Sequence, residues 1–397
     1  MSEFDDLGHP VFDGDNHYYE ALDAFTRHLD PALGTRCVQW CEINGRKYHV
    51  LGGQVSHAVT NPTFSPIAKP GAMYDYFRGN SDGRNPLEYL ADREPIRDEY
   101  LKPDARVVRL DQQQLAGCWL FPTLGMIYEE PLKADPFAVT TTFRAFNRWL
   151  LEDWGFNHED RIYTAPYLTL ADPAWAVEEL TWAVENGART IVMRPAAPTT
   201  ELGVRSPFDP IFDGFWSTLN DAGITLVLHA SDGGVSSNGY AVDGFAATFS
   251  GGGWKPSIKS HAIERAIDDY LLSMVYEQQF KKFPNLRVAA VENGAEFLPD
   301  LFRKATSTAH KMQGYFADDP IDVFREHVWI NPFWEDDVYE IAELMGEDRV
   351  IFGSDWPHIE GMPEPLDYAK ELKDFDPADR KKILLDNVLE LSTPRPT

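Results

Sequence analysis

The feature of this sequence that most constrains its fold is the alternation of eight short apolar runs with amphipathic stretches. The runs have the composition of buried strands, and the stretches between them place apolar residues at helical spacing. We predict strands at PVFDGD near residue 12, GCWLFP near 119, IYTAPYL near 165, TIVMRP near 192, TLVLHAS near 228, RVAAVEN near 290, HVWINPF near 330 and RVIFGSD near 352. Eight such units in series predict an α/β fold, a closed (β/α)₈ TIM barrel rather than an open sheet.

Helix boundaries between the runs support this interpretation. The segments PAWAVEELTWAVENGA and PIFDGFWSTLNDAG each begin with Pro and have Gly shortly after their end, as helices often do. The chain of 397 residues shows no internal repeat of solenoid length. We therefore expect a single barrel domain over residues 1–397.

Two segments interrupt the regular spacing. Residues 36 to about 100 follow the first strand, and the Gly-rich residues 232 to about 256 follow the fifth. In a barrel both insertions come after strand C-terminal ends, where substrates bind. We interpret them as pocket walls or lids, and the alternative is that they make oligomer contacts or decorate the surface.

Composition excludes several classes of partner. A formal net charge of −27 repels phosphate backbones and anionic lipid, so neither nucleic acid nor a membrane is expected as a partner. Cys37, Cys41 and Cys118 form no CxxC pair and no disulfide framework, which is typical of a reducing compartment. The sequence also lacks a signal-peptide pattern and a long apolar run, and we predict a cytoplasmic location.

Candidate metal ligands fall at the ends of predicted strands. Asp13, Asp15 and His17 alternate at the end of the first strand and therefore share one face, while His229 ends the fifth run and Asp355 the eighth. In a closed barrel these groups converge at one rim. We predict one divalent metal ion on Asp15, His17, His229 and Asp355. Imidazole and carboxylate donors suit zinc, our first expectation, and also ferrous iron or manganese.

Such an ion lowers the pKa of bound water and polarises a carbonyl oxygen. Asp355 is placed to take the proton of that water. Each motif alone has a structural alternative, because a single His at a strand end is often a core residue and DGDNH is also an Asx-rich turn. The joint placement on strands one, five and eight favours a functional site.

On these segments the sequence resembles the amidohydrolase superfamily, in the amidohydrolase 2 branch that includes aminocarboxymuconate semialdehyde decarboxylase and the resorcylate decarboxylases. The segments that carry the resemblance are FDGDNHYYE with Asp13, Asp15, His17 and Glu20, LVLHASD with His229, FGSDWPH with Asp355, and the closing helix KILLDNVLEL with Asn387. The resemblance implies a metal-dependent enzyme acting on a small molecule.

Two departures from the family pattern shape the expected reaction. The fourth strand ends in Met193 and Arg194, where binuclear members carry a carboxylated lysine, so one metal is expected. The sixth ends in Glu292, where the decarboxylase branch usually has an acid/base histidine. Glu292 can orient water, act as general base or join the metal ligands. We therefore expect hydrolysis of an ester, thioester, lactone or amide. The alternatives are a non-oxidative decarboxylase of an aromatic or unsaturated acid and a catalytically inactive, ligand-binding barrel.

The predicted catalytic residues are Asp355, Glu292 and His358, and the predicted substrate-binding residues are Arg194, Trp356 and Glu20. Arg194 either clamps a substrate carboxylate or forms a structural ion pair. His358 either acts as an acid or only caps a turn. Glu20 can orient a metal ligand by contacting that ligand rather than the metal. The insertions contain His49, His57 and His261, which we expect to be structural.

The presumed mouth is rich in aromatic residues: Tyr18, Tyr19, Tyr74, Tyr76, Phe77, Tyr240, Phe245, Phe249, Trp254 and Trp356. Such walls favour a partly hydrophobic substrate. By analogy with related barrels we expect a homodimer.

Overall fold

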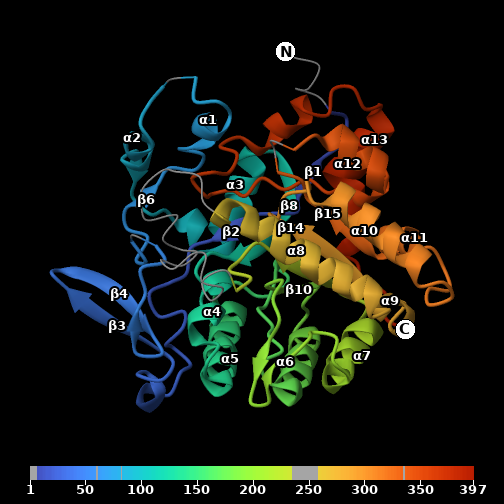
Figure 1. Cartoon of the computed structure of the whole chain (residues 1–397). Helices are drawn as coiled ribbons and strands as arrows, with labels where there is room; N and C mark the ends of the chain where they lie inside the picture. Colours follow the sequence, from blue (N-terminus) through green and yellow to red (C-terminus); the bar gives the residue numbers. More distant parts are fainter. Residues whose placement is uncertain (1–6, 60, 82, 235–257, 334–335) are drawn as a thin grey trace.

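The computed structural model describes residues 7–59, 61–81, 83–234, 258–333 and 336–397, and within them parallel strands form a closed ring (Figure 1). The ring consists of β1 (Val11–Asp13), β8 (Leu115–Pro122), β9 (Ile162–Thr164), β10 (Thr190–Met193), β13 (Thr225–His229), β14 (Arg287–Val291), β15 (Val328–Ile330) and, in the eighth position, residues 350–352. β8 pairs with both β1 and β9, and β10, β13, β14 and β15 pair in that order.

Single bridges and hydrogen bonds join these sheets into the ring. Tyr167, just after β9, bridges to Val192 of β10, and Ile330 of β15 bridges to Val350. The backbone N–H of Gly14 donates to the carbonyl of Phe352 at 2.8 Å. The last strand therefore meets the first, and the predicted (β/α)₈ barrel is confirmed.

Helices surround the strands and alternate with them along the chain (Figure 1). They are α3 (Pro103–Gln112), α5 (Pro136–Asp153), α6 (Pro173–Glu185), α7 (Asp213–Ala222), α8 (Ile258–Tyr276), α10 (Leu298–Lys311), α11 (Pro320–His327), α12 (Val338–Met345) and α14 (Asn387–Leu391). The Asp172 side chain caps α6 by accepting from two backbone N–H groups, and Gly223 ends α7 in the left-handed conformation. Both predicted helices are present, the second preceded by a 3₁₀ turn at Pro210–Phe212.

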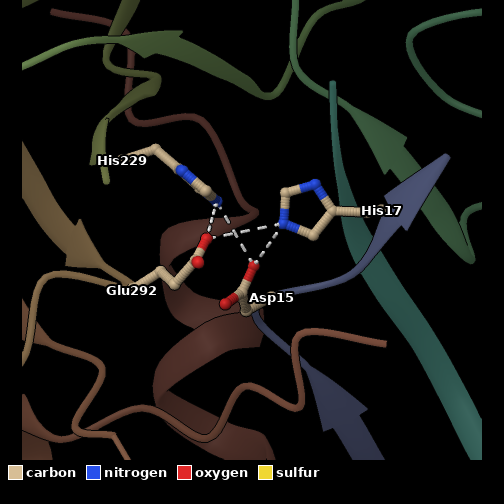
Figure 2. A group of neighbouring side chains, drawn as sticks. All are labelled: Asp15, His17, His229 and Glu292. Atoms are coloured by element: carbon tan, nitrogen blue, oxygen red, sulfur yellow. Dashed lines mark ion pairs between the residues drawn. The ribbon is translucent and has the colours of Figure 1, made fainter. Parts of the chain in front are cut away.

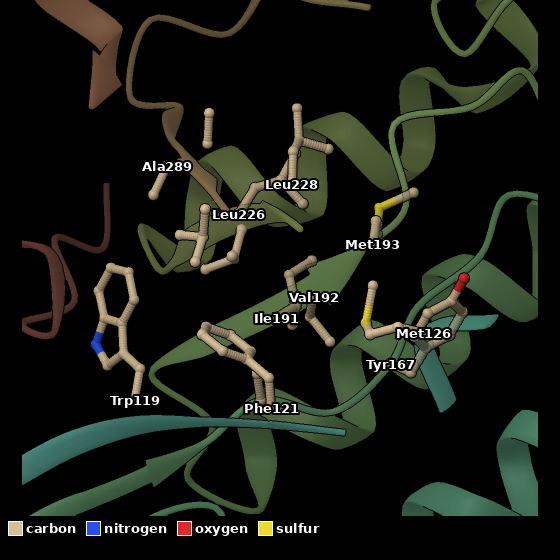
Figure 3. Close-up of a cluster of buried hydrophobic side chains, with 14 of the residues drawn as sticks. Trp119, Phe121, Met126, Tyr167, Ile191, Val192, Met193, Leu226, Leu228 and Ala289 are labelled. Carbon is tan, nitrogen blue, oxygen red and sulfur yellow. The ribbon is translucent and has the colours of Figure 1, made fainter. Parts of the chain in front are cut away.

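The strands carry the apolar core (Figure 3). Trp119 and Phe121 of β8 and Leu226 and Leu228 of β13 are all fully buried. Burying a side chain of this size stabilises a fold by about 1.5–3 kcal/mol, so a barrel of such residues holds its shape firmly.

The C-terminal segment covers one end of the barrel. The Asn387 amide donates to the carbonyl of Val350 at 2.7 Å, at the start of the last strand position. The Thr225 hydroxyl, at the start of β13, donates to the carbonyl of Leu391 at 2.7 Å. This end carries the starts of the strands, which leaves their C-terminal ends at the opposite face for a site.

The predicted insertion after the first strand forms its own small elements. β3 (Val38–Ile43), β4 (Arg46–Leu51) and β5 (Gln54–Val55) make an antiparallel sheet, whose β3–β4 hairpin stands out from the body in Figure 1. β6 (Ile67–Ala68) pairs with β7 (Arg93–Glu94).

The remaining short elements are β2 (His17–Tyr18), α1 (Tyr74–Phe77), α2 (Pro86–Leu90), α4 (Glu129–Leu132), β11 (Thr199–Thr200), β12 (Gly203–Val204), α9 (Gln279–Lys282) and α13 (Pro377–Lys381). Most of the Gly-rich segment after β13, residues 235–257, lies outside the described residues. Among the described helices, none combines the length and apolar character needed to cross a membrane.

Candidate metal centre

Four side chains from four places on the barrel rim point toward one another (Figure 2). Asp15 follows β1, His17 begins β2, His229 ends β13 and Glu292 follows β14. Their nearest nitrogen and oxygen atoms all lie within 4.8 Å of one another. The Nε2 atom of His17 is 3.3 Å from Asp15, and the Nε2 atom of His229 is 3.5 Å from Asp15 and 3.2 Å from Glu292.

The hydrogen bonds of the two histidines fix the nitrogens that face the centre. Nδ1 of His17 contacts the carbonyl of Pro122 at 3.2 Å, and Nδ1 of His229 contacts the carbonyl of Ala230 at 3.0 Å. A carbonyl only accepts, so each Nδ1 carries a proton and each neutral imidazole presents an Nε2 lone pair to the centre. Histidine ligands of metals are commonly oriented in this way.

The centre also contains buried polar atoms without hydrogen-bond partners. These are Oδ1 of Asp15 and the Nε2 atoms of His17 and His229. Each of these side chains is at most 2% exposed, so leaving the atoms unsatisfied is costly. A divalent cation would satisfy all three, and the donor set of carboxylates and imidazoles suits zinc, manganese or ferrous iron.

Asp355 lies beside this group rather than within it. Its Oδ1 atom is 3.4 Å from Nε2 of His17 and 2.6 Å from Nδ1 of His358. It belongs to a second donor group with His17 and His358, and to a third with Glu292 and Glu360. The sequence predicted Asp355 as the fourth ligand, whereas the structure brings Glu292 into mutual range of the other three. Asp355 as a ligand stays a prediction.

Backbone conformation explains how Glu292 and Asp355 reach the centre. Both have positive φ, 57° and 56°, a left-handed conformation that non-glycine residues adopt uncommonly. Gly353, two residues before Asp355, permits the last strand to approach Asp15 closely, because a Cβ atom at position 353 would lie 2.4 Å from Cβ of Asp15. The two strand ends therefore turn into the site at positions that do not continue the strand alternation.

The protonation equilibria of the centre are strongly shifted. Burial and the charge of His358 lower the pKa of His17 to about 3. Burial would raise the pKa of Asp15, but the positive charge that His17 and His229 carry when protonated outweighs burial and holds that pKa below its usual range. Burial and the charge of Asp355 raise the pKa of Glu292 well above its usual range. Burial and nearby carboxylates, Glu360 foremost, do the same for Asp355. Crowded carboxylates resist ionisation unless a positive charge joins them.

His358 occupies a defined hydrogen-bonding position. The Thr123 hydroxyl donates to the carbonyl of Tyr18 at 2.8 Å, so its oxygen is left to accept from Nε2 of His358 at 3.0 Å. Nε2 of His358 therefore carries a proton. The 2.6 Å contact between Nδ1 and Asp355 then holds one shared proton, on either the imidazole or the carboxyl group.

A layer of buried polar residues supports the ligands. Asp13, predicted to share a face with Asp15 and His17, is fully buried, and its carboxylate accepts from Asn16 and Ser354 instead of joining the donor group. The guanidinium of Arg106, also fully buried, donates to the Asn16 side chain and to the His17 carbonyl, the latter at 2.7 Å. Sequence reasoning did not single out Arg106, because one Arg on a helix carries no motif.

A cavity of about 220 Å³ opens onto the centre. His17, His229, Glu292 and His358 lie at its base. Its walls are mostly apolar and include residues of the insertion, among them Phe64 and Ile67. These residues show that part of the inserted segment lines the cavity.

The three predicted substrate-binding residues lie outside the cavity lining. Arg194 is 4% exposed and pairs with Glu130 at 2.6 Å and Glu129 at 3.4 Å, which matches the structural ion pair considered from the sequence. Trp356 is fully buried under the guanidinium of Arg106. The Glu20 carboxylate accepts from the backbone N–H groups of Leu124 and Gly125, and so fixes the loop that follows β8.

The other aromatic and histidine candidates are dispersed. Tyr19 lines the cavity, whereas Tyr18 packs against Trp149 and Trp154. His49 is buried against Tyr128. Tyr74, Tyr76 and Phe77 lie on α1 away from the cavity lining, and His57 contacts Tyr48 edge to face. Tyr240, Phe245, Phe249, Trp254 and the side chain of His261 lie outside the described residues.

The chain is similar to solved structures and to a curated protein. An amidohydrolase from Mycobacterium avium subsp. paratuberculosis K-10 is 39% identical, covers 97% of this chain and 99% of its own, and superposes with a TM-score of 0.89. A dihydroxybenzoic acid decarboxylase from Polaromonas sp. JS666, solved with manganese and 2-nitroresorcinol, shares the fold at 19% identity and a TM-score of 0.60, over 81% of this chain and 93% of its own.

A curated relative, 2-amino-3-carboxymuconate-6-semialdehyde decarboxylase of Dictyostelium discoideum, is 24% identical over 132 residues. The match covers 30% of this chain and only 34% of that enzyme. Residues 129–391, more than half of the chain, match the family described as Amidohydrolase. Together with the barrel and the rim of carboxylates and imidazoles, this match establishes that the chain belongs to the amidohydrolase family.

Proposed function

We propose that this protein is a metal-dependent hydrolase that cleaves an ester, thioester, lactone or amide of a partly hydrophobic substrate. The observation that carries the proposal is the position of Glu292, whose carboxylate lies 3.2 Å from Nε2 of His229 and 3.8 Å from Nε2 of His17. A divalent cation held by Asp15, His17 and His229 with Glu292 or Asp355 would activate water and polarise a carbonyl group.

The charge of the site favours an uncharged reacting group. With neutral imidazoles, and with one proton shared between Asp355 and His358, the carboxylates of Asp15 and Glu292 balance the charge of a divalent cation. Two like charges 4 Å apart repel by about 4 kcal/mol at an effective dielectric constant of about 20. A substrate carboxylate therefore finds no net positive charge at this position and is repelled by the nearest carboxylates, whereas an ester or amide carbonyl is not.

Asp355 and His358 supply the proton transfers that hydrolysis needs. Asp355 takes the proton of the attacking water. The neighbouring Nδ1 of His358, at 2.6 Å, stabilises Asp355 through their hydrogen bond. The pair then returns a proton to the leaving group. Glu292 orients the water from the other side of the centre, and the apolar cavity walls exclude competing solvent.

Decarboxylation of an aromatic acid is the second candidate, because the Polaromonas and Dictyostelium relatives are named as decarboxylases. Against this candidate, the histidine that usually serves as acid and base in the decarboxylase branch is absent at the end of β14, where this chain has Glu292. The third candidate is a barrel that binds a ligand without turnover.

We also propose zinc as the native ion, with manganese or ferrous iron as alternatives, the cytoplasm as location and a homodimer as assembly. Elemental analysis of protein purified without added metal identifies the ion. Light scattering after gel filtration gives the mass of the assembly.

The deciding experiment loads the purified full chain separately with zinc, manganese and ferrous iron. It follows hydrolysis of an aryl ester, a γ-lactone, an acyl thioester and an anilide, and carbon dioxide release from dihydroxybenzoates. We expect hydrolysis, and we expect Glu292→Gln to lower kcat about 100-fold. Glu296→Gln, an exposed glutamate four residues on, is the matched control.

Release of carbon dioxide without hydrolysis would reverse the order of the two enzymatic candidates, and Glu292→His would then be expected to raise the rate. No turnover in any arm, with metal bound, would favour the ligand-binding barrel.

A further inference from the structure

The cavity above the centre has acidic groups at its base and one guanidinium among its lining residues. Glu292 and Glu360 both line it, and Arg93 of β7 is the only Lys or Arg among the described lining residues. The other lining side chains are mostly apolar, with Val59, Phe64 and Ile67 contributed by the insertion. The cavity therefore combines an acidic region, an apolar body and a single cation.

The Arg93 guanidinium is not neutralised by its neighbours. Its Nε donates to the carbonyl of Leu90 at 3.1 Å, and it forms no ion pair within 4 Å in the part of the chain that the structure describes. The acids on either side of it in the sequence have other partners. Asp92 pairs with Lys69 at 2.9 Å, and Glu94 pairs with Arg97 at 2.8 Å. The two terminal nitrogens of Arg93 remain available to a ligand.

Backbone pairing connects Arg93 to the loop that carries His358. Ala68 of β6 pairs with Arg93 of β7, and the N–H of Lys69 donates to the carbonyl of Asp92 at 3.0 Å. Two residues further on, the N–H of Gly71 donates to the carbonyl of His358 at 2.9 Å. The backbone of the segment that bears Arg93 is thus connected by hydrogen bonds to the loop that carries His358, and the exposed Arg93 side chain lines the cavity.

We propose that Arg93 is a specificity residue that binds an anionic group of the substrate, a carboxylate, at the opposite end from the bond that is cleaved. This inference rests on the proposed hydrolase function and adds the substrate class: an uncharged ester, lactone, thioester or amide on an apolar body with a remote carboxylate. The acidic base of the cavity repels the carboxylate while Arg93 attracts it, so the substrate enters in one orientation. A guanidinium pairs with a carboxylate through two parallel hydrogen bonds, and this adds selectivity over a neutral group.

Ligand binding tests the inference without turnover. The probes are 4-hydroxybenzoate, 4-hydroxyphenylacetate and 3-(4-hydroxyphenyl)propanoate, each beside its methyl ester, because the series varies the distance from ring to carboxylate. Titration calorimetry is expected to show at least one acid binding more tightly than its methyl ester. Arg93→Gln is expected to weaken that acid about 10-fold and to leave the ester unchanged. Arg46→Gln removes the same charge from the exposed β4 and should change neither.

Turnover separates this inference from the function on which it rests. The acetate ester of the preferred acid, with its carboxylate free, is compared with the same acetate ester carrying a methylated carboxylate. We expect Arg93→Gln to raise KM for the free acid with little change in kcat, and Arg93→Lys to restore part of the loss. Equal binding of every acid and its methyl ester, or no effect of Arg93→Gln, overturns the role of Arg93 even if hydrolysis occurs. Selective binding without any hydrolysis keeps Arg93 as an anion-binding residue and overturns the hydrolase.

Discussion

Asp13, at the end of the first barrel strand, accepts two hydrogen bonds from Ser354, which follows the last. The Ser354 hydroxyl donates to Oδ2 at 2.6 Å and the Ser354 N–H donates to Oδ1 at 2.9 Å. Both residues are buried, and each is close in sequence to an acid of the site: Asp13 lies two residues before Asp15, and Ser354 immediately precedes Asp355. This contact sets the distance between the two acids where the barrel closes.

Ser354→Ala is expected to weaken the contact between the first and last strands of the barrel. The variant removes a hydrogen bond to a buried carboxylate, which contributes about 1.5–3 kcal/mol to stability. We expect urea unfolding to show a loss of about 2 kcal/mol, and we expect affinity for zinc to fall about 10-fold because the ligands are less well positioned. Ser206→Ala, at an exposed serine that accepts a backbone N–H, is the control. Equal losses in the two variants would contradict the special role of Ser354.

The metal content of the chain tests the centre directly. We expect about one ion per chain in the parent protein and close to none in His229→Ala, because that variant removes a buried imidazole donor from the four-residue group. Elemental analysis by mass spectrometry measures both. His310→Ala, on the exposed face of α10, controls for the loss of a histidine. A parent protein free of metal after incubation with zinc, manganese and ferrous iron would contradict the proposed centre.

Gly71 connects the inserted segment to the loop that carries His358, and it has no room for a side chain. Its φ is +67°, and a Cβ atom there would lie 2.6 Å from Cδ of Pro363. We expect Gly71→Ala to displace the hydrogen bond to His358, to raise KM several-fold and to lower stability by about 1–3 kcal/mol. Gly79→Ala is the matched control, since Gly79 has φ +99° and nothing within 4 Å of the added Cβ. Thermal unfolding and measurements of KM compare the two variants, and an equal effect would mean that backbone strain alone is responsible.

The barrel could be predicted from the sequence because its strands are continuous apolar runs with polar residues at their ends. Runs such as TLVLH and RVAAV became β13 and β14 with those boundaries almost unchanged. The rim residues Asp15, His17 and His229 followed from the same logic, since parallel strands bring their C-terminal ends together. A pattern that repeats along a strand is a local property, and local properties can be read from sequence.

The sequence could not predict the relative positions of Glu292 and Asp355. Both lie just past a strand end in a left-handed conformation, and strand alternation gives no direction for a side chain there. Trp356 was predicted to bind substrate as one of the aromatic residues near the presumed mouth, but the buried Arg106 packs over it. Arg93 carries no motif, and the only signal for it was an arginine between two acids whose partners, Lys69 and Arg97, are visible only in the fold.

His49 gives the chain a predicted acid sensitivity that is independent of the centre. The side chain is 2% exposed, its Nδ1 contacts the Tyr128 hydroxyl at 2.5 Å, and its ring packs at a tilt against Trp40. Burial lowers the pKa of His49 from 6.5 to about 3. Between these values the unfolded chain binds a proton that the folded chain excludes. The contribution of His49 to the free energy of unfolding is therefore at its full value above pH 6.5 and decreases as the pH falls toward 3.

At pH 5 the binding of this proton stabilises the unfolded state by about 2 kcal/mol, because each pH unit below 6.5 contributes about 1.4 kcal/mol. We expect the free energy of unfolding, measured by urea at pH 7 and pH 5, to fall by about 2 kcal/mol more in the parent than in His49→Gln, which keeps a polar side chain for Tyr128 but does not titrate. His310→Gln, at an exposed site, should follow the parent. If His49→Gln lost as much stability as the parent over this interval, the acid sensitivity would have to come from other buried groups.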